Sequence, residues 1–104
     1  SNGLNVPDIG IKGSTVTDAI SQEYDIPKGV YIKEAVVDSP AMTAGLQMGD
    51  VIVSINKEEV LSMNDYQRIV LNLKKGEEVR ITANRQNAEG YKKFSCVVEV
   101  GVLR

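Results

Sequence analysis

The segment from Ser39 to Asn56 reads Ser-Pro-Ala-Met-Thr-Ala-Gly-Leu-Gln-Met-Gly-Asp-Val-Ile-Val-Ser-Ile-Asn and combines a helix start, a turn and a strand. Its first residue is a typical N-cap, and Pro40 suits the first helical position because the N–H that proline lacks has no helical partner there. Gly45 stands where a short helix would end, and Gly49-Asp50 predicts a turn. Apolar residues at period two, with a further isoleucine between them, predict a strand over residues 51–55 that is covered on both faces.

The composition limits the chain to one domain and excludes several partners. A length of 104 residues is enough to bury a core without disulfides or metals, but it leaves no room for a second domain. The net charge is -2, with acids and bases scattered along the chain, so we expect no nucleic-acid partner. The sequence has neither the run of roughly 18 apolar residues of a membrane-spanning helix nor a signal-peptide pattern, so we expect no direct membrane insertion by this chain. A longer, anchored protein can still contain it.

The chain has no histidine and a single cysteine, Cys96. Without histidine it cannot assemble a Ser-His-Asp or Cys-His triad, and it lacks the commonest metal ligand. Cys96 lies in an apolar strand pattern, which favours a buried and inert thiol, and a lone cysteine forms no intramolecular disulfide. We therefore expect no catalytic residues, no metal site and no cofactor in this chain.

Three elements are predicted upstream of the quoted segment. Residues 8–11, Asp-Ile-Gly-Ile, read as the start of an edge strand, with a glycine that permits positive φ or close approach of another backbone. A threonine, Thr15 or Thr17, can cap a short helix over residues 18–24. A run rich in β-branched residues predicts a strand over residues 30–37.

The main helix is predicted downstream of the quoted segment. Ser62, with an aspartate three residues later, makes a capping-box-like start, and Gly76 marks the expected end. One apolar stripe on this helix, at positions i, i+4 and i+7, consists of Tyr66, Val70 and Leu73. Ile69 points in a neighbouring direction. Beyond this helix, alternating apolar residues predict two strands, over residues 77–86 and 91–100, joined by a turn.

The pattern Ser-Pro-Ala-x-x-Ala-Gly-Leu-x-x-Gly-Asp-x-Ile-x-x-Ile-Asn over residues 39–56 resembles the signature segment of PDZ domains. It is similar in particular to the PDZ domains of bacterial HtrA-type serine proteases, which are DegP-like and trypsin-like, and the resemblance extends from Asp8 to Val100. One departure is Lys57, because the family usually has glycine after the asparagine. This departure predicts a different turn type or a strained left-handed residue, and leaves the fold unchanged.

The resemblance implies an α+β, PDZ-like fold. We expect a five- to six-stranded, partly open β-barrel or sandwich, capped by a main helix and one or two short helices. The Ile-Gly-Ile loop lies near the N-terminus, which is the circularly rearranged strand order of bacterial PDZ domains. Residues 1–3 are interpreted as a cloning remnant or flexible end, and residues 4–104 as a single PDZ domain.

The resemblance also implies a peptide-binding groove. Its loop, Asp8-Ile9-Gly10-Ile11, would offer successive backbone N–H groups to a C-terminal carboxylate, and the strand edge from Ile11 to Ser14 would pair with the incoming peptide. The stripe Tyr66, Val70 and Leu73 would form the opposite wall, and with Ile9 and Ile11 it would make an apolar pocket for the last ligand side chain.

The same residues also have plainer interpretations. A helix stripe usually faces the core, and residues 9–11 can be an ordinary edge strand. Many relatives carry a basic residue shortly before the loop, whereas this chain has Val6 and Pro7 there, so Lys12 is the nearest cation and is itself expected to be solvated. Carboxylate binding would then depend on backbone N–H groups, with an affinity of about micromolar order.

By resemblance, the chain is a module that captures C-terminal or exposed hydrophobic segments of unfolded proteins by β-strand addition. It would recruit substrates to, or regulate, an extracytoplasmic bacterial HtrA-type protease in protein quality control, with the attached protease domain upstream. The location would be periplasmic or on the cell surface. Two alternatives stay open: the PDZ domain of a C-terminal processing protease or an intramembrane metalloprotease, and a stand-alone PDZ adaptor. An upstream trypsin-like domain with a Gly-x-Ser-x-Gly motif would distinguish the first interpretation from the others.

Overall fold

The computed structural model describes residues 5–103, so the interpretation of residues 1–3 lies outside the described part of the chain. Within residues 5–103 the fold is mixed α+β, with three helices and eight strands. The helices are α1 Asp18–Tyr24, α2 Pro40–Thr43 and α3 Met63–Leu71. The strands are β1 Pro7–Asp8, β2 Ile11–Val16, β3 Gly29–Ala35, β4 Val51–Ile55, β5 Glu58–Glu59, β6 Glu78–Asn87, β7 Gly90–Glu99 and β8 Gly101–Val102.

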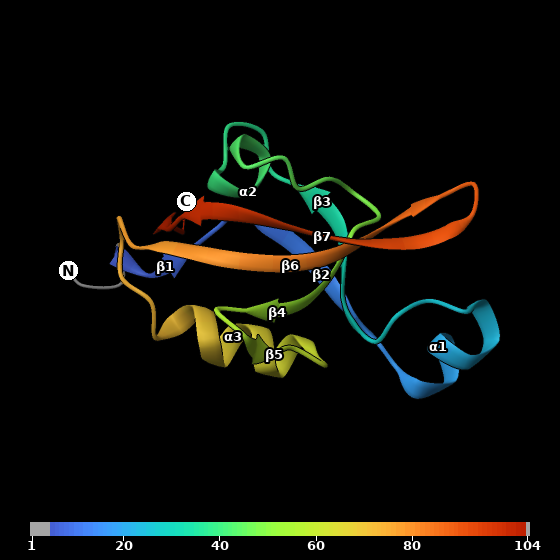
Figure 1. Ribbon diagram of the computed structural model, residues 1–104. Coiled ribbons are helices and arrows are strands. Elements are labelled where there is room, and N and C mark those ends of the chain that lie inside the picture. The colour runs from blue at the N-terminus through green and yellow to red at the C-terminus, as the bar shows by residue number, and fades with distance from the viewer. Residues whose placement is uncertain (1–4, 104) are drawn as a thin grey trace.

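The strands form two antiparallel sheets (Figure 1). The larger sheet has six strands in the order β2-β3-β4-β6-β7, with β5 paired to β4, and it does not close into a barrel. The smaller sheet pairs β1, near the start of the chain, with β8, near its end. The α+β class and the partly open sheet predicted from the sequence are confirmed.

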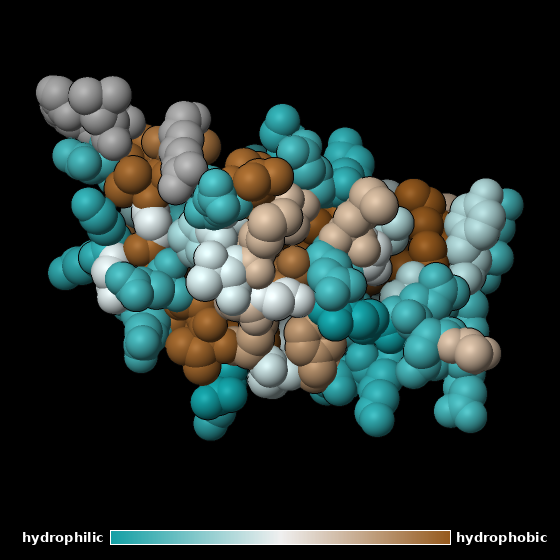
Figure 2. All heavy atoms as spheres, turned by 90° about the horizontal axis from the view of Figure 1, so that it is seen from above, coloured by the Kyte–Doolittle hydropathy of each residue, from teal (hydrophilic) through white to brown (hydrophobic). Residues whose placement is uncertain are grey.

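Two of the three helices flank the β6–β7 hairpin, and the third lies away from it. In Figure 1, α2 and α3 lie on opposite sides of the β6–β7 hairpin, while α1 stands apart from the body of the molecule. No residue of α1 is buried, so packing against the core contributes little to this helix. Figure 2 shows that apolar side chains gather mostly in the half of this face nearer the chain termini, whereas the hairpin end is mostly hydrophilic.

Three predicted helix starts are confirmed by their caps. The hydroxyl oxygens of Thr17, Ser39 and Ser62 each accept a hydrogen bond from the backbone N–H three residues later, at 3.1–3.2 Å. The Asp65 carboxylate accepts the Leu61 N–H at 2.9 Å, one residue before the Ser62 N–H that a capping box uses. These bonds satisfy amides that would otherwise lack partners at the helix ends.

The predicted end of the main helix was wrong. α3 ends at Leu71, with Asn72 as its C-cap, instead of continuing to Gly76. The N–H groups of Asn72 and Leu73 bond to carbonyls three residues back, which tightens the last turn. The Asn72 side chain also donates to the Arg68 carbonyl at 2.8 Å, so this polar residue competes with helix continuation. Leu73 therefore lies beyond α3.

The core agrees with the strand periodicity read from the sequence. Val79, Ile81 and Ala83 of β6 are buried, as are Val98 in β7 and Val100 just after it. Cys96 is an exception, because it is only half-buried instead of fully buried. Its thiol still packs against the core, and burial raises its pKa, which disfavours the reactive thiolate.

The turn after Asn56 keeps a conformation that favours glycine, although Lys57 stands at its second central position. Both residues have positive φ, 49° and 69°, and the pairs Ile55–Glu58 and Ser54–Glu59 flank them in the β4–β5 hairpin. Positive φ at both central residues defines a type I′ turn. The predicted left-handed lysine is confirmed.

An ion pair that the sequence did not reveal joins the signature segment to the β6–β7 hairpin. The Arg85 guanidinium donates two hydrogen bonds to the Asp50 carboxylate, at 2.9 and 2.8 Å, and a third to the Gly45 carbonyl at 2.8 Å. It also lies 4.6 Å from the centre of the Phe94 ring. Because the Asp50 side chain is almost fully buried, this bidentate pair holds the α2–β4 connection in place.

Candidate functional site

The loop before β2 is oriented by hydrogen bonds from two other segments. The carbonyl of Ile9 accepts the Ala41 N–H at the start of α2, and the carbonyl of Gly10 accepts the Val36 N–H after β3, both at 2.8 Å. In a trans peptide the N–H points opposite to the C=O. The N–H groups of Gly10 and Ile11 are therefore directed away from α2 and β3, as an anion-binding loop requires.

Gly10 is required by both its conformation and its surroundings. Its φ is +87°, in the left-handed region that favours glycine. A Cβ at this position would collide with the side chain of Ser39, the N-cap of α2. The loop thus lies directly against the signature segment, which explains how residues 39–56 determine its shape.

β2 is an edge strand of the large sheet, since within residues 5–103 it pairs with β3 alone. α3 lies beside it: the Met63 N–H donates to the Thr15 hydroxyl at 3.0 Å. A Cβ on Gly13 would lie 3.3 Å from the Met63 sulfur. The strand edge and the helix are the two predicted walls, and they are in contact at the N-terminal end of α3.

The apolar side chains of the predicted pocket are packed together instead of lining an open groove. Tyr66 is 4% exposed, Val70 3% and Ile9 0%, while Ile11 and Leu73 are half-buried against the same core. Ile69 is likewise buried at 6%, so Ile69 and Val70 differ little in exposure in this structure. A helix nine residues long that packs closely on two sheets buries most of one side, which includes both positions.

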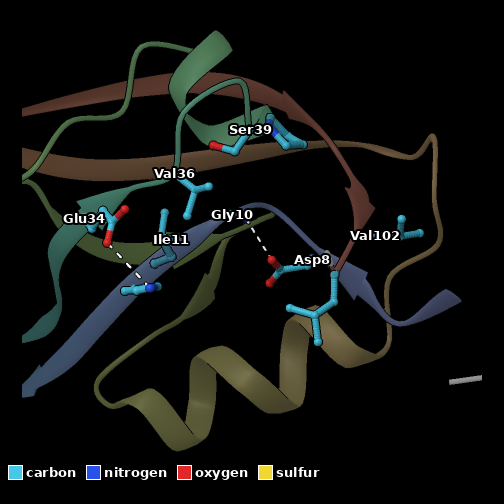
Figure 3. A pocket seen from close by; sticks show the side chains of 10 residues that line it. Asp8, Gly10, Ile11, Glu34, Val36, Ser39 and Val102 are labelled. Atoms are coloured by element: carbon cyan, nitrogen blue, oxygen red, sulfur yellow. Dashed lines mark hydrogen bonds and ion pairs between the residues drawn. The ribbon is translucent and has the colours of Figure 1, made fainter. Parts of the chain in front are cut away.

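A cavity of about 350 Å³ opens at the loop (Figure 3). Four of the eight predicted site residues line it: Asp8, Gly10, Ile11 and Lys12. The remaining lining residues, which sequence reasoning missed, are Glu34, Val36, Ser39, Pro40, Val102 and Leu103. Ser39 and Pro40 belong to the signature segment, but nothing in the sequence indicated that the residues of β8 and its end return to this loop.

The charged groups at this cavity are Asp8, Lys12 and Glu34. The ammonium of Lys12 lies 3.7 Å from the Glu34 carboxylate, and both side chains are more than half exposed, so this pair contributes little. Asp8 is half-buried, and its Oδ2 accepts the Gly10 N–H at 3.1 Å. Burial raises the pKa of Asp8 above its ordinary value of 3.8, and hydrogen bonds from the Gly10 and Ile9 amides partly offset this effect.

One buried polar atom lies on α3, the helix that contacts β1. The Tyr66 hydroxyl is buried and has no hydrogen-bond partner among the described residues. Burial, and secondly the charge of the nearby Asp8, raise the pKa of this phenol, so it stays protonated and able to donate. A buried hydroxyl without a partner is costly, which makes Tyr66 a notable feature of the site.

Across residues 5–103, no three Cys, Asp or Glu side chains cluster in a way that could hold a metal ion. No helix in the same range is long and apolar enough to cross a membrane.

A family model described as a PDZ domain matches residues 31–85, about half of the chain. The chain belongs to the PDZ domain family. Its relatives include a probable periplasmic DegP-like serine endoprotease of Pseudomonas savastanoi, 33% identical over 97 residues, which cover 91% of this chain and 19% of that protein. Serine protease HTRA3 of Rattus norvegicus is 35% identical over 72 residues, covering 62% of this chain and 16% of the protease. The PDZ domain thus spans less than a fifth of these relatives.

A solved structure shows the same fold. The HtrA3 PDZ domain bound to a phage-derived ligand, FGRWV, superimposes with a TM-score of 0.76 at 25% identity. The match covers 93% of this chain and 86% of that one. The sequence-based assignment to the PDZ domains of HtrA-type proteases is confirmed.

Proposed function

We propose that this PDZ domain binds extended peptide segments by adding them to the outer edge of β2, with a terminal carboxylate at the amides of the Gly10 loop. The observation that carries this proposal is the orientation of the loop. Its carbonyls are held by Ala41 and Val36, so its amides are directed away from the protein segments that orient it, beside an edge strand. Backbone pairing supplies affinity in this mode, and pockets for side chains supply specificity.

Binding in this mode requires α3 to move away from β2. Tyr66 and Val70 are buried in the unliganded structure, so a ligand side chain can enter only where these residues separate from Ile9 and Ile11. The bond between Met63 and Thr15 holds the N-terminal end of α3 to β2 and would resist this movement. Opening has a free-energy cost, so we expect an affinity of about micromolar order.

The relatives suggest the setting in which such a module works. They are named serine proteases, several of them periplasmic, and this domain covers under a fifth of each one reported above. We infer that it recruits unfolded or C-terminal segments to an attached protease domain, or regulates that domain, in extracytoplasmic protein quality control. The phage-derived ligand of the HtrA3 PDZ domain, FGRWV, ends in an apolar residue, which suits the apolar side chains around Ile11.

The proposal predicts that a peptide with a free C-terminal carboxylate and an apolar last residue binds more tightly than its C-terminal amide. Amidation removes the charge that the loop amides stabilise, and a hydrogen bond to a charged group contributes about 1.5–3 kcal/mol. Calorimetric titration of FGRWV and of its amide measures the difference. Equal affinities would indicate that the site reads internal segments instead.

A second experiment tests whether the peptide pairs with β2 as an added strand. A peptide N-methylated at a residue that pairs with β2 loses backbone donors without changing its side chains, so its affinity should fall. The same modification one residue along faces away from the strand and should have little effect, because alternate residues bond to opposite sides. Absence of saturable binding by every peptide would exclude the proposed function.

A further inference from the structure

The Gly10 amide already has an anionic partner in the unliganded domain. The Asp8 Oδ2 accepts its N–H at 3.1 Å, and Figure 3 shows this bond within the cavity. Asp8 belongs to β1, whose backbone is fixed by pairing with Gly101 in β8. Its side chain can nevertheless leave the amide by rotation about χ1, which requires no change in the strand.

An aspartate that accepts the N–H two residues later is a common local motif, so the bond alone indicates nothing special. Its surroundings distinguish it. The carboxylate is half-buried in a 350 Å³ cavity, and the nearby Tyr66 hydroxyl is a buried donor without a partner among the described residues. The Gly10 amide thus donates to this carboxylate as a donor does to a bound anion, and the Tyr66 hydroxyl is a second buried donor within electrostatic range of it.

We propose that Asp8 is a specificity-determining residue whose carboxylate occupies the anion position of the loop and competes there with the terminal carboxylate of a ligand. This inference rests on the proposed function, and assigns a role to a side chain where the sequence suggested only backbone donors. A ligand with a free C-terminus must displace Asp8 and tolerate its negative charge nearby. A ligand that continues past the loop, or ends in an amide, meets no such charge repulsion.

The other two charged side chains at the cavity are not placed to take the role proposed for Asp8. Lys12 and Glu34 line the same cavity but pair with each other across β2 and β3, at 3.7 Å, and both are largely exposed. Within residues 5–103 neither side chain bonds to the loop amides, whereas Asp8 bonds one of them directly. Glu34 therefore offers a matched control: it carries the same charge in the same cavity without occupying the loop.

The test compares the free-acid and amide forms of FGRWV with the wild-type domain, Asp8→Ala, Asp8→Asn and Glu34→Gln. Asp8→Ala removes both the charge and the occupant, so affinity for the free acid should rise about tenfold, which corresponds to about 1.4 kcal/mol. Asp8→Asn keeps an acceptor for the Gly10 N–H but removes the charge, so the affinity for the free acid should rise by an intermediate amount. Affinity for the amide should change less than threefold in every variant, which also reports that each variant is folded.

The inference is overturned if the ratio of acid to amide affinity stays the same or falls in both Asp8 variants. It is also overturned if Glu34→Gln raises that ratio as much as Asp8→Asn, since the effect would then be general electrostatics of the cavity. Failure of both peptide forms to bind any variant would instead remove the proposed function on which the inference rests. The role of Asp8 is supported if the ratio of acid to amide affinity is highest for Asp8→Ala, intermediate for Asp8→Asn and lowest for the wild type, with Glu34→Gln near the wild type.

Discussion

Gly10 illustrates how a single residue connects the fold to the binding loop. Its carbonyl bonds to Val36, its N–H bonds to Asp8, and its missing side chain leaves room for Ser39. Three separate segments therefore meet at one residue without a Cβ. Any side chain here would have to move the N-cap of α2 as well as adopt an unfavourable φ.

We expect Gly10→Ala to destabilise the domain and to weaken peptide binding. Positive φ costs a residue with a Cβ about 1 kcal/mol, and the collision with Ser39 adds a further cost of similar size. Gly76 provides the matched control, because it has the same φ of +87° but no atom within 4 Å of a built Cβ. Chemical denaturation should show that Gly76→Ala lowers the free energy of unfolding by the conformational cost alone. Equal losses for the two variants would show that Ser39 does not restrict the loop.

At the scale of elements, the relation between α3 and β2 decides whether a groove is open. The amphipathic pattern of α3 correctly indicated an apolar face, and its capped start is where the sequence placed it. The pattern could not distinguish a face that stays packed from one that opens for a ligand, because both require apolar side chains. In the structure this face belongs to the core.

This packing predicts that Val70→Lys lowers the stability of the free domain. Val70 is 3% exposed, so the ammonium would lack a partner in the core, at a cost of several kcal/mol out of a typical total of about 5–15 kcal/mol. Ile69→Lys should behave similarly at 6% exposure. Leu71 on the same helix is 59% exposed, and Leu71→Lys should change stability by less than about 0.5 kcal/mol.

Thermal melts of the three lysine variants, followed by peptide titration of those that fold, make the measurement. If Val70→Lys melts like Leu71→Lys but no longer binds peptide, α3 stands away from β2 in solution and the groove is already open. That outcome would contradict the packed arrangement and would favour the interpretation drawn from the sequence alone.

The whole molecule is elongated, with extents of 44 × 23 × 23 Å. Its two sheets serve different purposes. The six-stranded sheet contributes much of the core, whereas the β1–β8 pair fixes the residues that lead into and flank the loop. Val102 and Leu103 line the loop cavity because β8 returns to β1, although more than 90 positions separate the two strands in the sequence.

At this scale we also predict that the isolated domain has no proteolytic activity. The chain contains no histidine, so it has no general base of the triad type. Casein and a chromogenic peptide should remain intact during prolonged incubation with the purified domain, as measured by electrophoresis and absorbance against a buffer blank. Turnover that survives repeated purification would contradict the assignment of this chain as a binding module.

Most of the local elements, and the family, can be predicted from the sequence. Caps at Thr17, Ser39 and Ser62, the alternation in β6 and the left-handed Lys57 follow from short-range stereochemistry, which a few neighbouring residues control. The tertiary structure decided what these elements face. Burial of Val70, the Arg85–Asp50 pair and the return of β8 to the loop depend on contacts between distant segments. The early end of α3 depends on nearby bonds that helix periodicity does not encode. No periodicity in one segment specifies which other segment covers it, and for this reason the sequence alone does not show that Tyr66 and Val70 are buried in the free domain.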